Sequence, residues 1–263
     1  MNFISKLIIV IIILLMASVT LMGIEFYNLK NNQANLNGKI ETINNRLNFI
    51  PNKKSEPITT NETFGIDVSH WNGDIVSEIP SIDNISFVIC KATQGKKVVD
   101  SDFKLNWKSI KQLNKIRGAY HFYIYGDDPE EQANHFCEVV NDLEENDISL
   151  ILDIEELSLP KKGVNHAKLK EEVIKFLEIV ENKIKRIPII YTNYSFANEY
   201  LNDTTFSKFP LWLAEYSNSK KPTIPNVWKE KGCFIWQKKG NYNINSTKDD
   251  FDIYFGKKED LNK

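Results

Sequence analysis

The chain has 263 residues, of which 42% are hydrophobic and 26% are charged, a balance typical of globular proteins. Its formal net charge is −2 and its Lys and Arg residues are scattered, so the sequence lacks the basic stripe of a nucleic-acid-binding protein. Aromatic residues make up 11% of the chain, a generous supply for stacking on ligands or for filling a core.

Residues 1–24 contain a candidate membrane anchor. Lys6 precedes an uncharged run of eighteen residues, Leu7 to Ile24, which is just long enough for a helix to cross a bilayer. A cleaved signal peptide is the alternative, because a short basic start and an apolar run suit both. The run is long for a signal peptide and no A-x-A cleavage site follows it, so an uncleaved single-pass anchor is favoured.

Residues 25–50 follow with the pattern of a helical stalk. Seven apolar residues and one glutamine recur at alternating spacings of three and four: Phe26, Leu29, Gln33, Leu36, Ile40, Ile43, Leu47 and Ile50. This heptad spacing predicts either a coiled coil, through which the chain would self-associate, or a single amphipathic helix. Pro51 ends the pattern, and residues 51–63 are a polar linker.

In residues 64–263, short apolar segments alternate with amphipathic stretches. Strands are expected at residues 64–69, 86–92, 117–123, 149–155, 187–192, 211–216, 233–237 and 250–255. Helices are expected at Asp102 to Lys115, Pro129 to Asn141 and Val164 to Lys185. This alternation predicts an α/β fold, an irregular barrel with few helices near its C-terminal strands. An open doubly wound sheet is the alternative, although no glycine-rich phosphate loop follows any strand.

The cysteines and histidines give no sign of a metal site. Cys90, Cys137 and Cys233 include no CxxC pair and no histidine at ligand spacing, so we expect no structural metal, no cofactor and no required disulfide. His121, in the segment AYHFY, is either a residue of the barrel mouth or a hydrogen-bonded structural histidine. No GxSxG motif supports a serine nucleophile.

The strongest single feature is a buried strand that ends in acid, ISLILDIEE at residues 148–156. Alternate side chains of a strand face opposite sides, so Leu152 and Ile154 face one way while Asp153 and Glu155 face the other. If the apolar pair packs beneath the outer helices, the two carboxylates point into the barrel at its C-terminal mouth. Active sites of such barrels lie at that mouth.

Two more acids, Asp67 and Asp252, occupy comparable places, so four carboxylates from three strands are expected to converge on one rim. Crowded carboxylates raise one another's pKa, so one can stay protonated while another is ionised. Glycoside hydrolysis uses such a pair, with one member as the acid for the leaving oxygen and the other as nucleophile, base or charge stabiliser.

Eight segments, taken in order, make the sequence resemble glycoside hydrolase family 25, the muramidase family of lysozymes: GIDVSHWNG, FVICKATQG, RGAYHFY, LILDIEE, IIYTN, LWLAEY, FIWQ and FDIYFG. The resemblance implies an irregular barrel that hydrolyses the β-1,4 bond between N-acetylmuramic acid and N-acetylglucosamine in peptidoglycan. It implies Glu155 as the general acid, Asp153 as its close partner, and Asp67 and Asp252 as further acids of the catalytic group. Retaining, inverting and substrate-assisted mechanisms stay open, with net retention favoured.

The resemblance also implies a set of substrate-binding residues: Tyr120, Tyr191, Trp212, Tyr216 and Gln237. Barrel packing is the alternative role for the aromatic members. One position departs from the family pattern. The family usually reads K-A-T-E-G after its second strand, whereas this chain has KATQG, and Gln94 in place of the glutamate could change activity or specificity.

The anchor and the implied substrate fit together, since a tethered wall hydrolase reaches only nearby glycan. We therefore expect a hydrolase held at the cell membrane, with its catalytic domain at residues 64–263 on the extracytoplasmic side. The alternatives are a non-catalytic peptidoglycan-binding module, a hydrolase of another N-acetylated glycan such as chitin, and a stalk protein whose main role is oligomerisation.

Overall fold

The computed structural model describes residues 62–262, with gaps at residues 82–83, 218 and 245–246. The anchor expected at residues 1–24, the stalk at 25–50 and nearly all of the linker at 51–63 lie outside the described residues. Within the described part, no helix combines the length and the hydropathy that crossing a bilayer requires.

Eight strands form a closed barrel, as the sequence predicted. In chain order they are β1 (Thr63–Val68), β2 (Ile85–Gln94), β4 (Ile116–Phe122), β5 (Ile151–Asp153), β6 (Ile189–Asn193), β7 (Leu211–Ala214), β8 (Ile235–Ile244) and β9 (Thr247–Tyr254). The sheet closes because β1 pairs in parallel with β2 and antiparallel with β9. The strands from β2 to β8 pair in parallel, and β9 runs antiparallel to β8. A short strand β3 (Val98–Val99) pairs with the end of β2.

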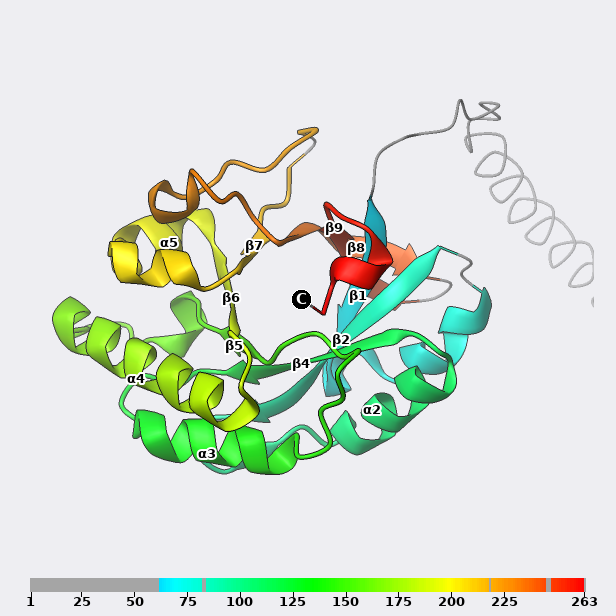
Figure 1. The fold of residues 1–263 in the computed structure, drawn as a ribbon, viewed down its shortest axis with the longest axis horizontal. Helices are drawn as coiled ribbons and strands as arrows, with labels where there is room; N and C mark the ends of the chain where they lie inside the picture. The colour runs from blue at the N-terminus through cyan, green and yellow to red at the C-terminus, as the bar shows by residue number, and fades with distance from the viewer. Residues whose placement is uncertain (1–61, 82–83, 218, 245–246, 263) are drawn as a thin grey trace, which may run out of the picture. The chain divides into compact units, whose positions relative to one another are not determined.

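The α-helices cover only part of the barrel. Three of them lie within the predicted helical stretches: α2 (Phe103–Gln112), α3 (Pro129–Val139) and α4 (His166–Ile184). The seven-residue α5 (Tyr194–Tyr200) is too short to show a helical period in the sequence, and the Asn193 side chain caps it by accepting from the Phe196 N–H. Figure 1 shows the helices on the outside of the barrel from β2 to β6, whereas the described parts of β8 and β9 carry none.

Short 3-10 turns complete the described chain: η1 (His70–Asn72), η2 (Ile75–Ser81), η3 (Glu156–Ser158), η4 (Thr204–Lys208), η5 (Asn226–Trp228) and η6 (Lys258–Asp260). Two of them, η1 and η3, directly follow the carboxyl ends of β1 and β5. They therefore set the direction in which the chain leaves the mouth of the barrel.

The hydrophobic core has two layers, one on each side of the sheet. The inner layer fills the barrel with Phe87, Ile89, Ile148, Ile151, Ile189, Trp212, Ile235, Tyr254 and Leu261. The outer layer lies between the sheet and the helices, and it contains Leu152 and Ile154. The predicted alternation along β5 is therefore confirmed. Each fully buried leucine or isoleucine side chain contributes about 1.5–3 kcal/mol to folding.

Two regions of the sheet differ in length from the prediction. β8 and β9 form a hairpin that is longer than predicted, with pairing as far as Ile244 and Thr247. The sequence did not predict this extension because its Lys, Asn and Gly residues have low strand propensity. β5 ends at Asp153, earlier than predicted, because the Glu155 N–H donates to Ser158 Oγ over 3.2 Å and the chain turns into η3.

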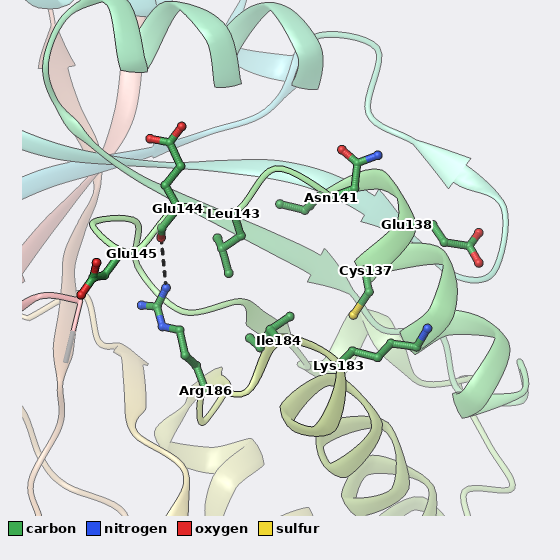
Figure 2. Close-up of a pocket in the computed structure, with 10 residues that line it drawn as sticks. Cys137, Glu138, Asn141, Leu143, Glu144, Glu145, Lys183, Ile184 and Arg186 are labelled. Carbon is green, nitrogen blue, oxygen red and sulfur yellow. Dashed lines mark hydrogen bonds between the residues drawn. The ribbon is translucent and has the colours of Figure 1, made fainter.

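A buried ion pair and an arginine clamp hold the end of the barrel opposite the mouth. Arg117, near the start of β4, donates from Nε and Nη2 to the two carboxylate oxygens of Asp147 over 2.8 and 2.6 Å. Its guanidinium lies 4.0 Å from the centre of the Trp107 ring. Arg186 donates to the backbone carbonyls of Asp147 (2.6 Å) and Glu144 (3.4 Å), and Figure 2 shows the second of these bonds. The loop between α3 and β5 is therefore fixed to the sheet by two cations.

Candidate active site

A cavity of about 550 Å³ opens at the carboxyl ends of the barrel strands. It is lined by Asp67, Ser69, Trp71, Lys91, Gln94, Tyr120, Phe122, Ile124, Asp153, Glu155, Leu157, Tyr191, Trp212, Tyr216 and Gln237. A slightly larger hollow of about 630 Å³ lies between the C-terminal ends of α3 and α4 (Figure 2), but no aromatic side chain lines it and its Arg186 is occupied by backbone carbonyls. The mouth cavity, with its acids and aromatic rings, is therefore the candidate active site.

Three of the four predicted acids line this cavity. Asp67 lies near the end of β1, Asp153 is the last residue of β5, and Glu155 follows two positions later. Because β5 alternates as predicted, Asp153 continues the inward row that begins with Ile151. The position of these three acids at the cavity agrees with the convergence expected from the sequence.

The fourth acid, Asp252, differs from the expectation because it does not line the cavity. It is fully buried, and Trp212 donates from Nε1 to its Oδ1 over 2.8 Å. In the sheet it pairs with Gly65, two residues before Asp67, so it enters the barrel one layer below the rim. Asp252 therefore orients the indole of Trp212 from behind the cavity wall.

Burial dominates the electrostatics of Asp153. Removal of its carboxyl group from water raises its pKa well above the usual value, and the charges of Glu155 and Asp67 raise it further, while Lys91 lowers it. Its Oδ1 is buried and has no hydrogen-bond partner among the described residues. Burial and the neighbouring charges therefore favour a protonated carboxyl group at Asp153.

We expect Asp153→Asn to stabilise the fold at neutral pH. A carboxyl group whose pKa is raised on folding favours the folded state below its unfolded pKa of about 3.9, and this contribution is lost as the pH rises through the folded pKa. At neutral pH the buried carboxylate therefore opposes folding, and the uncharged amide should raise the free energy of unfolding by about 0.5–2 kcal/mol. Urea unfolding at neutral pH and at about pH 3 measures this.

The exposed Asp74→Asn is the matched control for this substitution and should change stability at neither pH. An equal gain for Asp153→Asn at both pH values would assign the effect to packing rather than to charge.

Gln237 connects the aromatic wall to Asp67. Its Oε1 accepts from the hydroxyl groups of Tyr191 (2.8 Å) and Tyr216 (2.7 Å), and its Nε2 donates to Asp67 Oδ2 over 2.7 Å. Two hydroxyl donors on the oxygen fix the orientation of the amide, so its N–H must face the carboxylate. Gln237 was predicted to bind substrate, and in the structure it lines the cavity and holds Asp67.

The aromatic residues predicted from the sequence all line the cavity. Trp212 makes edge-to-face contacts with Tyr191 at 4.5 Å and with Tyr120 at 6.4 Å between ring centres. Burial raises the pKa of both tyrosines well above the usual value, so their hydroxyl groups stay neutral and can donate. Tyr120 and Tyr191 also pack against the inner core, so the same two rings fill the barrel and line the cavity.

A bulge in β2 brings Lys91 and Gln94 into the same cavity. The register between β2 and β4 shifts between Lys91 and Thr93, so two residues three positions apart both reach the mouth. Lys91 Nζ donates to Gln94 Oε1 over 2.8 Å and lies 5.0 Å from the centre of the Phe122 ring. Gln94 occupies the position where the family usually has glutamate, so the hydrogen-bond partner of Lys91 is neutral here.

Lys91 was not predicted to be a site residue. The available signal was one lysine inside an otherwise apolar strand. Burial lowers the pKa of Lys91, and the negative charges of Asp153, Asp100 and Glu155 act in the opposite direction.

His121 is a structural residue of the outer layer. Its ring stacks on Phe176 at 5.1 Å, its Nδ1 lies 2.7 Å from Thr93 Oγ1, and its Nε2 lies 3.2 Å from Gln132 Oε1. Burial lowers its pKa to about 3, so the imidazole is neutral. Of the two roles left open by the sequence, the structure shows the hydrogen-bonded one.

A closed α/β barrel whose mouth holds paired carboxyl groups among aromatic rings is the arrangement that glycoside hydrolases use. Sequence comparison gives the particular family: a sequence model of the glycosyl hydrolases family 25 matches residues 66–247. The chain belongs to this family.

Several known proteins and solved structures are similar to the chain. The uncharacterized protein YegX of Escherichia coli K12 is 30% identical over 207 residues, which cover 75% of this chain and 71% of that protein. The autolytic lysozyme of Clostridium acetobutylicum is 29% identical over 72% of this chain and 55% of its own length. A lysozyme structure from Streptomyces coelicolor (26% identity, TM-score 0.69) covers 76% of this chain and 95% of its own. A family GH25 lysozyme structure from Aspergillus fumigatus (27%, TM-score 0.69) covers 76% and 97%.

Proposed function

We propose that this glycoside hydrolase is an N-acetylmuramidase, which cleaves the β-1,4 bond between N-acetylmuramic acid and N-acetylglucosamine in peptidoglycan. The observation that carries the proposal is the acid pair Asp153 and Glu155 in one cavity with Tyr120, Tyr191 and Trp212. The lysozymes among the similar proteins support the substrate class.

In the proposed reaction, Glu155 donates its proton to the glycosidic oxygen as the bond to the sugar C1 breaks. Asp153 lies beside it and stabilises the positive charge that develops on the sugar ring. Asp67, held by Gln237, orients the substrate from the opposite side of the mouth. Glu155, now ionised, takes a proton from the attacking water in the second half of the reaction, which restores the starting state.

We propose net retention at C1. Either the Asp153 carboxylate or the acetamido oxygen of the substrate attacks C1 first, and water then displaces it, so two inversions leave the configuration unchanged. Proton NMR during early turnover distinguishes this from inversion, because the first product of retention is the β-anomer. An α-anomer appearing first would overturn this part of the proposal.

Product analysis on purified peptidoglycan tests the function. The full chain should release glycan fragments with new reducing ends on N-acetylmuramic acid. New reducing ends on N-acetylglucosamine, or cleavage of chitin in preference to peptidoglycan, would overturn the substrate assignment. Binding to peptidoglycan without any product would instead identify a wall-binding module, and Gln94→Glu would then restore the usual family residue.

We further propose that residues 1–24 anchor the enzyme in the cell membrane, with the catalytic domain on the extracytoplasmic side. The uncharged run from Leu7 to Ile24 and the location of the proposed substrate support this. Such a tether would confine cleavage to nearby glycan, as in local remodelling of the wall. Release of the full chain from membranes by alkaline carbonate would contradict an uncleaved anchor.

A further inference from the structure

Trp71 is the exposed tryptophan of the described chain. Its side chain is 83% exposed, while the other four tryptophans of the sequence are at most 5% exposed. Single exposed apolar residues are common on protein surfaces. Trp71 differs from such residues because it lines the same cavity as the acid pair.

The backbone that carries Trp71 is held in place. The Ser69 N–H donates to Asn72 Oδ1 over 2.8 Å, and Ser69 Oγ accepts from the Trp71 N–H over 3.3 Å, so η1 is closed at its start. His70 Nδ1 lies 2.5 Å from the buried carboxylate of Asp100, which follows β3. The His70 ring also lies against the indole, at 4.4 Å between centres. The indole is therefore both exposed and positioned before any ligand binds.

Trp71 lies across the mouth from the aromatic wall. It follows β1, whereas Trp212 lies on β7 and Tyr216 follows β7, and the strands β9 and β8 separate β7 from β1 in the closed sheet. Leu157, which follows the acids of β5, is 79% exposed and lines the same cavity, and Tyr216 is 60% exposed. The acid pair therefore has exposed apolar groups on both sides, which suits a polymer that crosses the mouth rather than a small ligand enclosed by it.

We propose that Trp71 is a stacking platform for a pyranose ring of the glycan strand, in a subsite beyond the two sugars joined by the scissile bond. This inference rests on the proposed function and specifies the length of glycan that the enzyme recognises. The flat C–H face of a β-1,4-linked sugar matches the indole, while the hydroxyl and acetamido groups at the edge of the sugar stay in water. The fixed backbone means that little ordering of Trp71 opposes binding.

Chain-length kinetics test the proposal in the full protein. For Trp71→Ala, kcat/KM on a peptidoglycan glycan octasaccharide should fall roughly three- to tenfold, the size of one lost aromatic contact, whereas turnover of a tetrasaccharide should fall much less. Trp71→Phe should recover most of the loss, because it keeps a ring. Leu105→Ala is the matched control, since Leu105 is also exposed but lies on α2 outside the cavity. An equal loss on both substrates, or no loss on either, would overturn the subsite.

Fluorescence quenching gives a readout that catalysis does not affect. Acrylamide, a neutral quencher, should reach Trp71 far more easily than the four buried tryptophans. In the Glu155→Gln variant, the octasaccharide should protect this quenchable fraction, and the tetrasaccharide should not; Trp71→Phe should abolish the protected signal. Calorimetric binding of the octasaccharide without protection would overturn the subsite and leave the muramidase proposal intact. Absence of both binding and wild-type cleavage would overturn both.

Discussion

Replacing Glu155 with glutamine should reduce the rate of peptidoglycan cleavage by about 10²- to 10⁴-fold, the usual contribution of a general acid. Glutamine keeps the size and much of the hydrogen bonding of the side chain, but it cannot give a proton to the leaving oxygen. The initial rate at which reducing ends appear is the measurement. Binding of glycan should be retained, because the change removes a proton and leaves the cavity shape almost unaltered.

The next residue provides the control. Glu156 is an exposed carboxylate that accepts from Asn193 Nδ2 over 2.7 Å and does not line the cavity. Glu156→Gln should therefore cleave at the wild-type rate. Equal losses for both variants would remove the special role of Glu155. An aryl glycoside with an acidic leaving group offers a second check, since its departure needs little protonation, and Glu155→Gln should lose much less activity in forming the first product.

Asp147→Ala should destabilise the catalytic domain by about 3–5 kcal/mol, the usual cost of removing one partner of a buried ion pair. The Arg117 side chain is 2% exposed, so without Asp147 its guanidinium would remain buried and poorly compensated. The same substitution removes the acceptor for the Glu144 N–H. Urea unfolding followed by far-ultraviolet circular dichroism measures the change.

The exposed pair of Lys96 and Glu131 is the matched control for this prediction. Glu131→Ala should leave the free energy of unfolding almost unchanged, because water screens exposed charges. A loss of similar size in both variants would mean that burial adds nothing to the Arg117 pair. At a temperature where both remain folded, neither variant should alter KM, since both lie outside the cavity.

The alternation of side chains along a strand was sufficient to place Asp153, because one buried face fixes the direction of every other side chain in β5. Glu155 lies beyond the end of β5, and the turn into η3 sets its place in the cavity. Trp212 and Tyr216 came from the family resemblance, and both line the cavity. The depth of Asp252 in the barrel was not predicted, since the alternation along a strand gives the side of the sheet but not the depth. Depth depends on the register between β9 and β1, which joins segments from opposite ends of the domain.

Other parts of the site depend on contacts that a local pattern does not contain. The bulge in β2 turns both Lys91 and Gln94 into the mouth, and a single extra residue leaves no periodic signal. Trp71 packs against His70, whose ring is held by the carboxylate of Asp100, thirty residues further along the chain. The hairpin of β8 and β9 was missed beyond Gln237, because pairing between strands compensates for residues of low strand propensity.

The antiparallel seam between β1 and β9 also determines when the enzyme becomes active during its synthesis. Asp67 and the Gln237 amide that holds it are 170 residues apart in the chain. β9, the final strand of the barrel, has to arrive before the seam between β8 and β1 can close. A growing polypeptide therefore lacks the complete acid group until the ribosome has finished nearly the whole domain. A nascent chain would thus be unable to cut glycan, and cutting could begin only once translation is almost complete.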